Sequence, residues 1–392
     1  MSETSDDPRS IAGRVTPGWE PVRDVFAQNL AHGDSGAACC IYLDGEPVVD
    51  LIGGLADDRR GTPWTTDTIV PVFSTTKGAT ATCANLLVER GRLDPDAPVA
   101  QYWPEFAAAG KDRVLVRHVL SHTAGLPVVE GDFTLAEALS WFPVVEQLAT
   151  QTPRWEPGTQ VGYHLRSFGW LVGELIRRID GRTPGRFFRE EIADPLHLDW
   201  WIGLPEPFES RVARVIPPPR SDDPEVRALM DAVMAPGTLM GDALTGPANR
   251  FRYDEMWNTR ELHACELPSS NGIASAPAVA RLYASLVGPV DGVQTLTAET
   301  ITRATTPLIA GTDVVIGAPM RYGLGYSLGD ALSSAAPPTG FGHSGAGGSL
   351  GFADPAVGLA FGYVMTRMQV GLAEDRRPRN LVRAAYAALA GM

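Results

Sequence analysis

Apolar residues near the start of the chain recur with two different periods, which predict a helix followed by strands. A helical spacing over about residues 19–33 ends at a glycine and consists of Trp19, Val22, Val25, Phe26 and Leu30. Two strand-like runs follow at residues 37–43 and 48–52, joined around Asp44-Gly45, a dipeptide favoured in hairpin turns. The chain is therefore expected to open with a helix and an antiparallel pair of strands.

The C-terminal third adds strands and a last helix. Residues 322–328 alternate between apolar and other positions with period two, and residues 359–365 form a further apolar run. A helical stripe then covers residues 381–389. Both ends of the chain thus predict a layered α+β (α/β layered) fold, in which an antiparallel β-sheet is flanked by the N- and C-terminal helices.

Helical signals dominate the middle of the chain. One apolar stripe runs from Phe168 to Ile179 before Gly181, and Thr183-Pro184 is typical of the start of another helix. Residues 204–249 are rich in proline and are expected to form loops or short helices. We therefore expect a mobile leader at residues 1–16, a sheet domain made of residues 17–91 and 264–392, and an inserted, mainly helical domain at residues 92–263.

Charge and composition narrow the range of partners. A formal net charge of −13 argues against nucleic acid or an anionic membrane, because either favours a basic face. The chain has no run of 18 or more apolar residues, and its acidic start does not resemble a secretory signal. The seven scattered histidines predict no metal site, and no cofactor is expected. We expect a cytoplasmic protein with reduced, mostly buried cysteines at Cys39, Cys40, Cys83 and Cys265.

Candidate chemistry begins with one serine and one lysine. The chain has only two lysines, Lys77 and Lys111, among 33 basic residues, and Lys77 lies three residues after Ser74 in a helix-like segment. Residues at i and i+3 share one face of a helix. A serine becomes an effective nucleophile when a nearby base, such as a lysine of lowered pKa, accepts its proton. A capping serine beside a solvated lysine explains the same two residues, so this pair alone leaves both interpretations open.

Three further motifs accompany this pair. The four segments are F-S-T-T-K at Phe73–Lys77, V-L-S-H-T-A-G-L-P at Val119–Pro127, E-P-G-T-Q-V-G-Y-H-L at Glu156–Leu165 and G-H-S-G at Gly342–Gly345. In order and spacing they resemble the serine β-lactamase and penicillin-binding protein superfamily, particularly class C β-lactamases and family VIII carboxylesterases. The resemblance extends from about residue 20 to the C-terminus. It implies a β-lactamase/penicillin-binding-protein-like fold.

The resemblance also implies a role for each matching residue. Ser74 matches the acylated serine, Lys77 its partner, and Tyr163 the tyrosine that shuttles the proton. A phenolate beside an ammonium group would have a lowered pKa and could serve as a general base. The backbone N–H groups of Ser74 and Ala346 would form the oxyanion hole.

Two departures from the family pattern bear on the substrate. The third motif, His343-Ser344-Gly345, corresponds to Lys-Thr-Gly in β-lactamases and is expected to bind substrate, so His343 replaces a lysine that attracts a carboxylate. Leu165 stands where β-lactamases carry an asparagine that binds the side-chain carbonyl of a lactam. Both changes leave a less polar site, so ester hydrolysis is expected to outrank lactam hydrolysis.

The walls of the acyl pocket are harder to derive from the sequence. Residues 231–240, Trp257 and the turn at Pro268–Gly272 are candidates. Asn271, which precedes a glycine in this turn, could equally serve as a turn former.

Two patterns suggest other catalytic residues. Residues 347–351 match the Gly-x-Ser-x-Gly elbow around Ser349, but a turn rather than a helix is expected after it, so Ser349 is not expected to react. His118 and His122 invite a Ser-His-Asp interpretation. The resemblance implies a structural turn there, and we expect both histidines to make hydrogen bonds.

We therefore expect a serine carboxylesterase that hydrolyses small carboxylic esters through an acyl-enzyme on Ser74. A β-lactamase, a D-amino acid peptidase and an acyltransferase remain alternatives, because they use the same acyl-enzyme. A catalytically inactive binding protein is the alternative from another class, and the presence of Ser74, Lys77 and Tyr163 argues against it.

Overall fold

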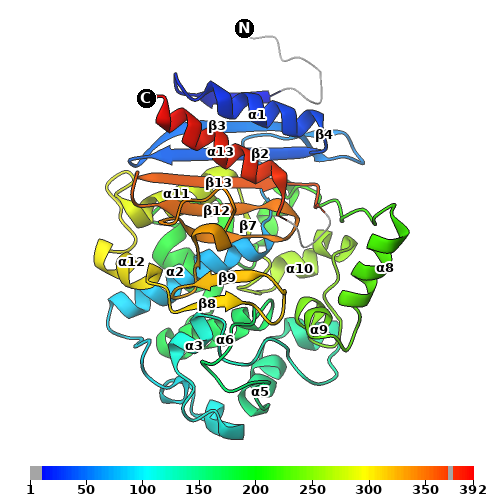
Figure 1. Cartoon of the computed structure of the whole chain (residues 1–392), viewed down its shortest axis with the longest axis vertical. Helices are drawn as coiled ribbons and strands as arrows, with labels where there is room; N and C mark the ends of the chain where they lie inside the picture. Colours follow the sequence, from blue (N-terminus) through cyan, green and yellow to red (C-terminus); the bar gives the residue numbers. More distant parts are fainter. Residues whose placement is uncertain (1–10, 370–373) are drawn as a thin grey trace.

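One large antiparallel sheet organises the structure, a computed structural model that describes residues 11–369 and 374–392 (Figure 1). Within those residues the sheet has ten strands, in the order β1-β3-β2-β13-β12-β11-β10-β9-β8 with β4 beside β3. Every neighbouring pair is antiparallel. The strands are β1 (Ile11–Val15), β2 (Gly36–Leu43), β3 (Glu46–Asp57), β4 (Thr62–Pro63), β8 (Ile309–Thr312), β9 (Pro319–Tyr322), β10 (Ser327–Leu328), β11 (Phe341–Ser344), β12 (Leu350–Asp354) and β13 (Leu359–Met365).

Helices cover both faces of this sheet, and the predicted N- and C-terminal helices share one of them. Figure 1 shows α1 (Glu20–Ala31) and α13 (Arg376–Ala390) side by side on one face, while α11 (Ala276–Val287) and α2 (Thr76–Glu89) lie on the other. Side chains of a strand alternate between the faces. Cys39 therefore packs in the core beneath α1 and α13, and Cys40 packs in the core on the side of α11.

Between α2 and α11 the chain is mainly helical. The helices there are α3 (Val116–Leu120), α4 (Leu135–Leu139), α5 (Phe142–Thr150), α6 (Ser167–Asp180), α7 (Pro184–Phe188), α8 (Pro224–Val233), α9 (Leu239–Thr245) and α10 (Arg260–Ala264), and α12 (Ala298–Thr305) follows α11. No helix in residues 11–369 and 374–392 combines the length and the hydropathy needed to cross a bilayer. The division of the chain at residues 91/92 and 263/264 into two domains stays a prediction.

Several short elements complete the described chain. Short 3-10 helices occupy η1 (Phe73–Thr75), η2 (Val99–Gln101), η3 (Pro104–Gly110), η5 (Glu206–Arg211), η6 (Glu255–Asn258), η7 (Gly329–Ala331) and η8 (Ala346–Gly348), and η4 (Arg189–Ala193) is a short π-helix. A second, three-stranded sheet joins β5 (Val70–Pro71), β7 (Ile273–Ala274) and β6 (Trp200–Trp201). Strands of two residues leave no period in a sequence, so this small sheet was not predicted.

Most of the predicted elements are confirmed, and two need correction. Residues 322–328 form two strands, because β9 ends at Tyr322 and the chain turns back through Gly325, whose φ is +88°, before β10. The expected leader at residues 1–16 is also too long. Its residues 11–15 form β1, which pairs with β3, whereas residues 1–10 lie outside the described part. Backbone hydrogen bonds to β3 hold β1 in the sheet, and the pattern of apolar residues in a sequence does not reveal such bonds.

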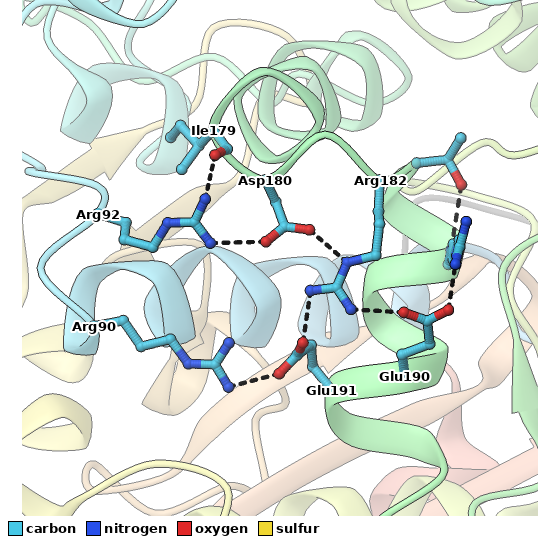
Figure 2. A network of polar contacts seen from close by, with 9 residues as sticks. Arg90, Arg92, Ile179, Asp180, Arg182, Glu190 and Glu191 are labelled. Atoms are coloured by element: carbon cyan, nitrogen blue, oxygen red, sulfur yellow. Dashed lines mark hydrogen bonds and ion pairs between the residues drawn. The ribbon is translucent and has the colours of Figure 1, made fainter.

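An ion-pair network joins the residues that follow α2 to the end of α6, the turn after α6, and η4 (Figure 2). Arg182 lies at its centre, with 22% of its side chain exposed, and contacts Asp180 at 2.5 Å, Glu190 at 2.7 Å and Glu191 at 2.6 Å. From the end of α2, Arg90 contacts Glu191 at 2.6 Å and Arg92 contacts Asp180 at 2.8 Å. Because one arginine bridges three carboxylates, its loss leaves several charges without their partner.

The network predicts a graded effect on stability. Arg182→Ala should lower the free energy of unfolding by about 1–2 kcal/mol, since three partly buried ion pairs are lost together. Arg186→Ala is the matched control, because Arg186 makes one ion pair with Glu190 and its side chain is 67% exposed. Urea denaturation of both variants measures the difference. Equal effects of the two substitutions would contradict a special role for Arg182.

Candidate active site

The candidate nucleophile lies in a constrained turn at the start of α2. Ser74 is the middle residue of η1 and is 8% exposed. The residue before it, Phe73, has φ of +48°, which is rare for a side chain of this size. The ring of Phe73 packs edge-on against Trp257 and Tyr253, with centroids 5.0 and 5.6 Å away. Packing therefore holds a strained backbone in place next to Ser74.

Lys77 lies one helical turn further on and is fully buried. Its Nζ is 3.1 Å from Ser74 Oγ, so the two residues share one face of the helix, as predicted. Nζ also donates to the carbonyl oxygens of Leu165 at 2.8 Å and Ser269 at 3.0 Å. A solvated lysine beside a capping serine is thereby excluded. Ser269 belongs to the turn that the sequence analysis names as a candidate pocket wall. Nothing in the sequence predicts that its carbonyl oxygen accepts a hydrogen bond from Lys77.

Tyr163 and His343 meet beside this pair. The Tyr163 ring centroid is 4.8 Å from Lys77 Nζ, and its hydroxyl lies 3.3 Å from Nε2 of His343. Nδ1 of His343 lies 2.6 Å from the carbonyl oxygen of Ser344, which accepts only, so Nδ1 carries the proton. Nε2 is then the acceptor for the Tyr163 hydroxyl. His343 is 3% exposed and contacts Tyr163, whereas the sequence predicts a side chain that binds substrate directly.

Burial shifts the pKa of each ionisable group of this site against its charged form. Burial lowers the pKa of Lys77 well below its usual range, and the positive charge of Arg166 adds to this effect. Burial also lowers the pKa of His343 to about 3, helped by the positive charge of Lys77. It raises the pKa of Tyr163, although a hydrogen bond with Ser74 opposes the rise. Burial thus opposes the phenolate that the sequence analysis considers for Tyr163, and the role of this tyrosine in proton transfer stays a prediction.

A turn after β11 approaches the start of α2 closely. A Cβ atom on Gly345 would lie 2.3 Å from the carbonyl oxygen of Val72 and 2.1 Å from Ser349 Oγ, so only glycine fits there. The backbone N–H groups of Ser74 and Ala346 donate to no acceptor within residues 11–369 and 374–392. Both groups are therefore available to a developing oxyanion.

Ser349 fastens the same two segments together. Its hydroxyl donates to the carbonyl oxygen of Val72 at 2.7 Å and lies 3.0 Å from Thr75 Oγ1. It is 1% exposed, and the strand β12 rather than a helix follows it. The structure thus confirms that the elbow motif lacks its helix, and it gives Ser349 a structural position.

The remaining predicted residues border the site in different ways. Leu165 packs beside Met240 in a cluster that also includes the Tyr163 ring, and its carbonyl holds Lys77. Ser344 is exposed at the end of β11. Asn271 is a turn former, because its side chain accepts from Leu267 N–H at 2.8 Å and donates to neighbouring carbonyls.

Both histidines of the 116–127 segment make hydrogen bonds, as predicted. Nδ1 of His122 accepts from the backbone N–H of His164 at 3.1 Å, and Nδ1 of His118 accepts from that of Leu115 at 3.3 Å. The His122 ring also packs edge-on against Tyr163, with centroids 4.9 Å apart. His122 therefore supports the tyrosine from behind.

The comparison with known proteins accords with this arrangement. The family model described as Beta-lactamase matches residues 22–386, and the chain belongs to this family. It is 35% identical over 378 residues to a protein named Esterase/beta-lactamase LipL from Mycobacterium tuberculosis, covering 93% of this chain and 84% of that protein.

Two solved structures are similar over nearly the whole chain. One is titled a family VIII carboxylesterase and has a TM-score of 0.87 at 37% identity, covering 97% of this chain and all of that one. A penicillin-binding protein homolog from Caulobacter crescentus has a TM-score of 0.87 at 38% identity with the same coverage. These matches confirm the predicted fold and the serine hydrolase class.

The close approach at Gly345 predicts a strong effect of one methyl group. Gly345→Ala should lower kcat/KM by about 100-fold or more, because the new Cβ displaces the turn that carries the Ala346 N–H. Gly311→Ala is the control, since a Cβ on Gly311 meets nothing within 4 Å. Steady-state hydrolysis of an aryl ester measures both. Near-normal activity of Gly345→Ala would show that the turn does not contribute to catalysis.

Proposed function

We propose that the protein is a serine carboxylesterase that forms an acyl-enzyme on Ser74. The observation that carries this proposal is the 3.1 Å contact between Ser74 Oγ and the buried Nζ of Lys77. The similarity to a structure titled a family VIII carboxylesterase, at 37% identity, supports the ester as substrate. The intact site argues against a catalytically inactive binding protein.

The contacts of Lys77 suggest how Ser74 is activated. A neutral amine has two N–H donors and one lone pair. The carbonyls of Leu165 and Ser269 take both donors, which leaves the lone pair for the Ser74 hydroxyl. Lys77 can then accept the serine proton while Oγ attacks the ester carbonyl. The N–H groups of Ser74 and Ala346 would stabilise the oxyanion.

Tyr163 is suited to the second half of acylation. The C–O bond of the ester breaks, and the departing alkoxide takes the hydroxyl proton of Tyr163, which the Lys77 ammonium replaces. Burial keeps Tyr163 protonated before this step, so it acts as a proton donor in acylation. Water then attacks the acyl-enzyme with the same groups in reverse, and the acid and free Ser74 are released.

The surroundings favour neutral esters over charged lactams. His343 with a pKa of about 3 brings no positive charge to the substrate at neutral pH. Leu165 offers an apolar side chain beside Met240 where an amide would be needed. A carboxylate or amide of a lactam would therefore lose its water without finding partners. β-Lactamase, D-amino acid peptidase and acyltransferase activities remain secondary candidates.

The cellular location also stays a proposal. We propose a cytoplasmic protein, as the sequence predicts. Its four cysteines are free thiols in the described structure, which accords with a reducing compartment.

The first test separates the two candidate serines. Ser74→Ala should remove hydrolysis, a loss of at least about 10⁴-fold in kcat, because no other group can take its place as nucleophile. Ser349→Ala should stay within about tenfold of the wild type, since it loses hydrogen bonds that fasten a turn. A fluorophosphonate probe with peptide mapping identifies the reacting serine. A label on Ser349, or equal losses in both variants, would contradict the assignment.

The second test concerns the substrate class. We expect a short aryl ester to be hydrolysed with a kcat/KM at least about 100-fold above that of a cephalosporin, since discrimination of this size follows from unpaired polar groups. His343→Lys restores a positive charge beside Tyr163 and should narrow this ratio. Parallel absorbance assays on both substrates measure it. A cephalosporin value equal to the ester value would overturn the esterase proposal.

A further inference from the structure

Arg166 is a buried cation without a counter-charge, one residue beyond Leu165. It is 4% exposed and makes no ion pair within residues 11–369 and 374–392. Its Nε donates to the carbonyl oxygen of Leu244 at 3.0 Å, and its Nη2 has no hydrogen-bond partner in the same part of the chain. Arginine keeps its proton under all physiological conditions. The charge is therefore permanent and largely uncompensated.

Aromatic rings replace the missing carboxylate. The guanidinium carbon lies 4.9 to 5.5 Å from the ring centroids of Trp257, Phe251 and Tyr253. Ring faces attract a cation, but far less than a paired carboxylate does. Retaining an arginine here costs stability, because a buried charge without a partner is unfavourable. This cost needs an explanation other than packing.

The backbone of Arg166 touches the groups that hold Lys77. Its carbonyl oxygen accepts from Ser269 Oγ at 2.9 Å, and the Ser269 carbonyl accepts from Lys77 Nζ at 3.0 Å. The preceding residue, Leu165, supplies the other carbonyl. Arg166 thus follows directly the segment that carries Tyr163 and is tied to the second segment that anchors the amine.

The other ionisable groups near the amine do not offset this charge. His122, His164 and His343 are buried, and burial lowers the pKa of each, so they stay neutral. Tyr163 and Tyr253 face Arg166, and the acid Asp313 faces Tyr163 and Tyr322. Arg166 lies behind the turn that carries Ser74, because the rings of Trp257 and Tyr253 that it contacts also pack against Phe73, with centroids 5.0 and 5.6 Å away. Its charge adds to the effect of burial, which lowers the pKa of Lys77.

We propose that Arg166 is a positioning residue whose uncompensated charge keeps Lys77 as a neutral amine, ready to accept the proton of Ser74. The proposal deepens the proposed function and rests on the roles given there to Ser74 and Lys77. When Oγ bonds to the ester carbonyl, its proton moves to Nζ and the carbonyl electron pair moves to oxygen. The new ammonium group is repelled by Arg166, which favours passing the proton through Tyr163 to the departing alkoxide.

The scarcity of lysine makes the charge state of Lys77 directly observable. Protein labelled with 13C at the lysine side chain gives signals from two residues only, Lys77 and Lys111. Lys111→Arg leaves one signal and assigns it. When the pKa of Lys77 is lowered, its amine stays neutral down to a lower pH. Removing a repelling charge should therefore move its titration to higher pH.

We expect Arg166→Met to shift the Lys77 titration to higher pH, because the substitution removes a repelling charge. Arg281→Met is the control, since 19% of the Arg281 side chain is exposed and Asp291 supplies the counter-charge that Arg166 lacks. Arg166→Gln replaces the methionine variant if thermal unfolding shows that the latter is not folded. An unchanged titration in a folded, uncharged variant would overturn the proposal.

A second measurement links this charge to reactivity. A fluorophosphonate should label Ser74 more slowly in Arg166→Met than in the wild type. The loss of labelling rate at the acidic end of the pH range should exceed the loss at the alkaline end by about threefold or more. A purely structural role would lower the rate equally at every pH, which would contradict the inference. Absence of label on Ser74 in the wild type would instead refute the proposed function, while the lysine titration would still test Arg166.

Discussion

The desolvated amine of Lys77 is the constraint on which the rest of the site depends. An amine buried this deeply needs an acceptor for each N–H, and it finds them on carbonyls 88 and 192 residues further along the chain. Meeting that demand brings together α2, the segment before α6 and the turn before β7. The sheet and the helical lobe therefore have to be assembled before the nucleophile has its base.

The same desolvation sets the charges of the neighbouring groups. Burial lowers the pKa of Lys77 and of His343 and raises that of Tyr163, so it opposes the charged form of each. A site of this kind holds its protons on hydrogen-bonded neutral groups and moves them when a substrate supplies the electrophile. Its one permanent charge, on Arg166, is kept behind the reacting atoms among aromatic rings.

Sequence reasoning succeeds where a local pattern decides the structure. The strand at Leu359–Met365 follows from a continuous apolar run, and the spacing of Ser74 and Lys77 follows from the 3.6-residue period of a helix. It fails where contacts between residues far apart in the sequence decide the structure. The carbonyl of Ser269 has no side-chain signature, Gly325 turns a run that looks like one strand, and the protonation of Tyr163 depends on burial that no motif encodes. Residue types identify the chemistry, but the environment sets their ionisation.

The position of the two lysines has a practical consequence. Both Lys77 and Lys111 are fully buried, and Lys111 donates to the carbonyls of Ala108 and Gln151 inside the lobe. A protease that cleaves after lysine finds no accessible site in the described native structure and can cut only after the core has opened. Each cleavage would then report an opening event, at α2 for Lys77 and directly after η3 for Lys111. Comparing the rates of the two cuts would show which part of the molecule opens first.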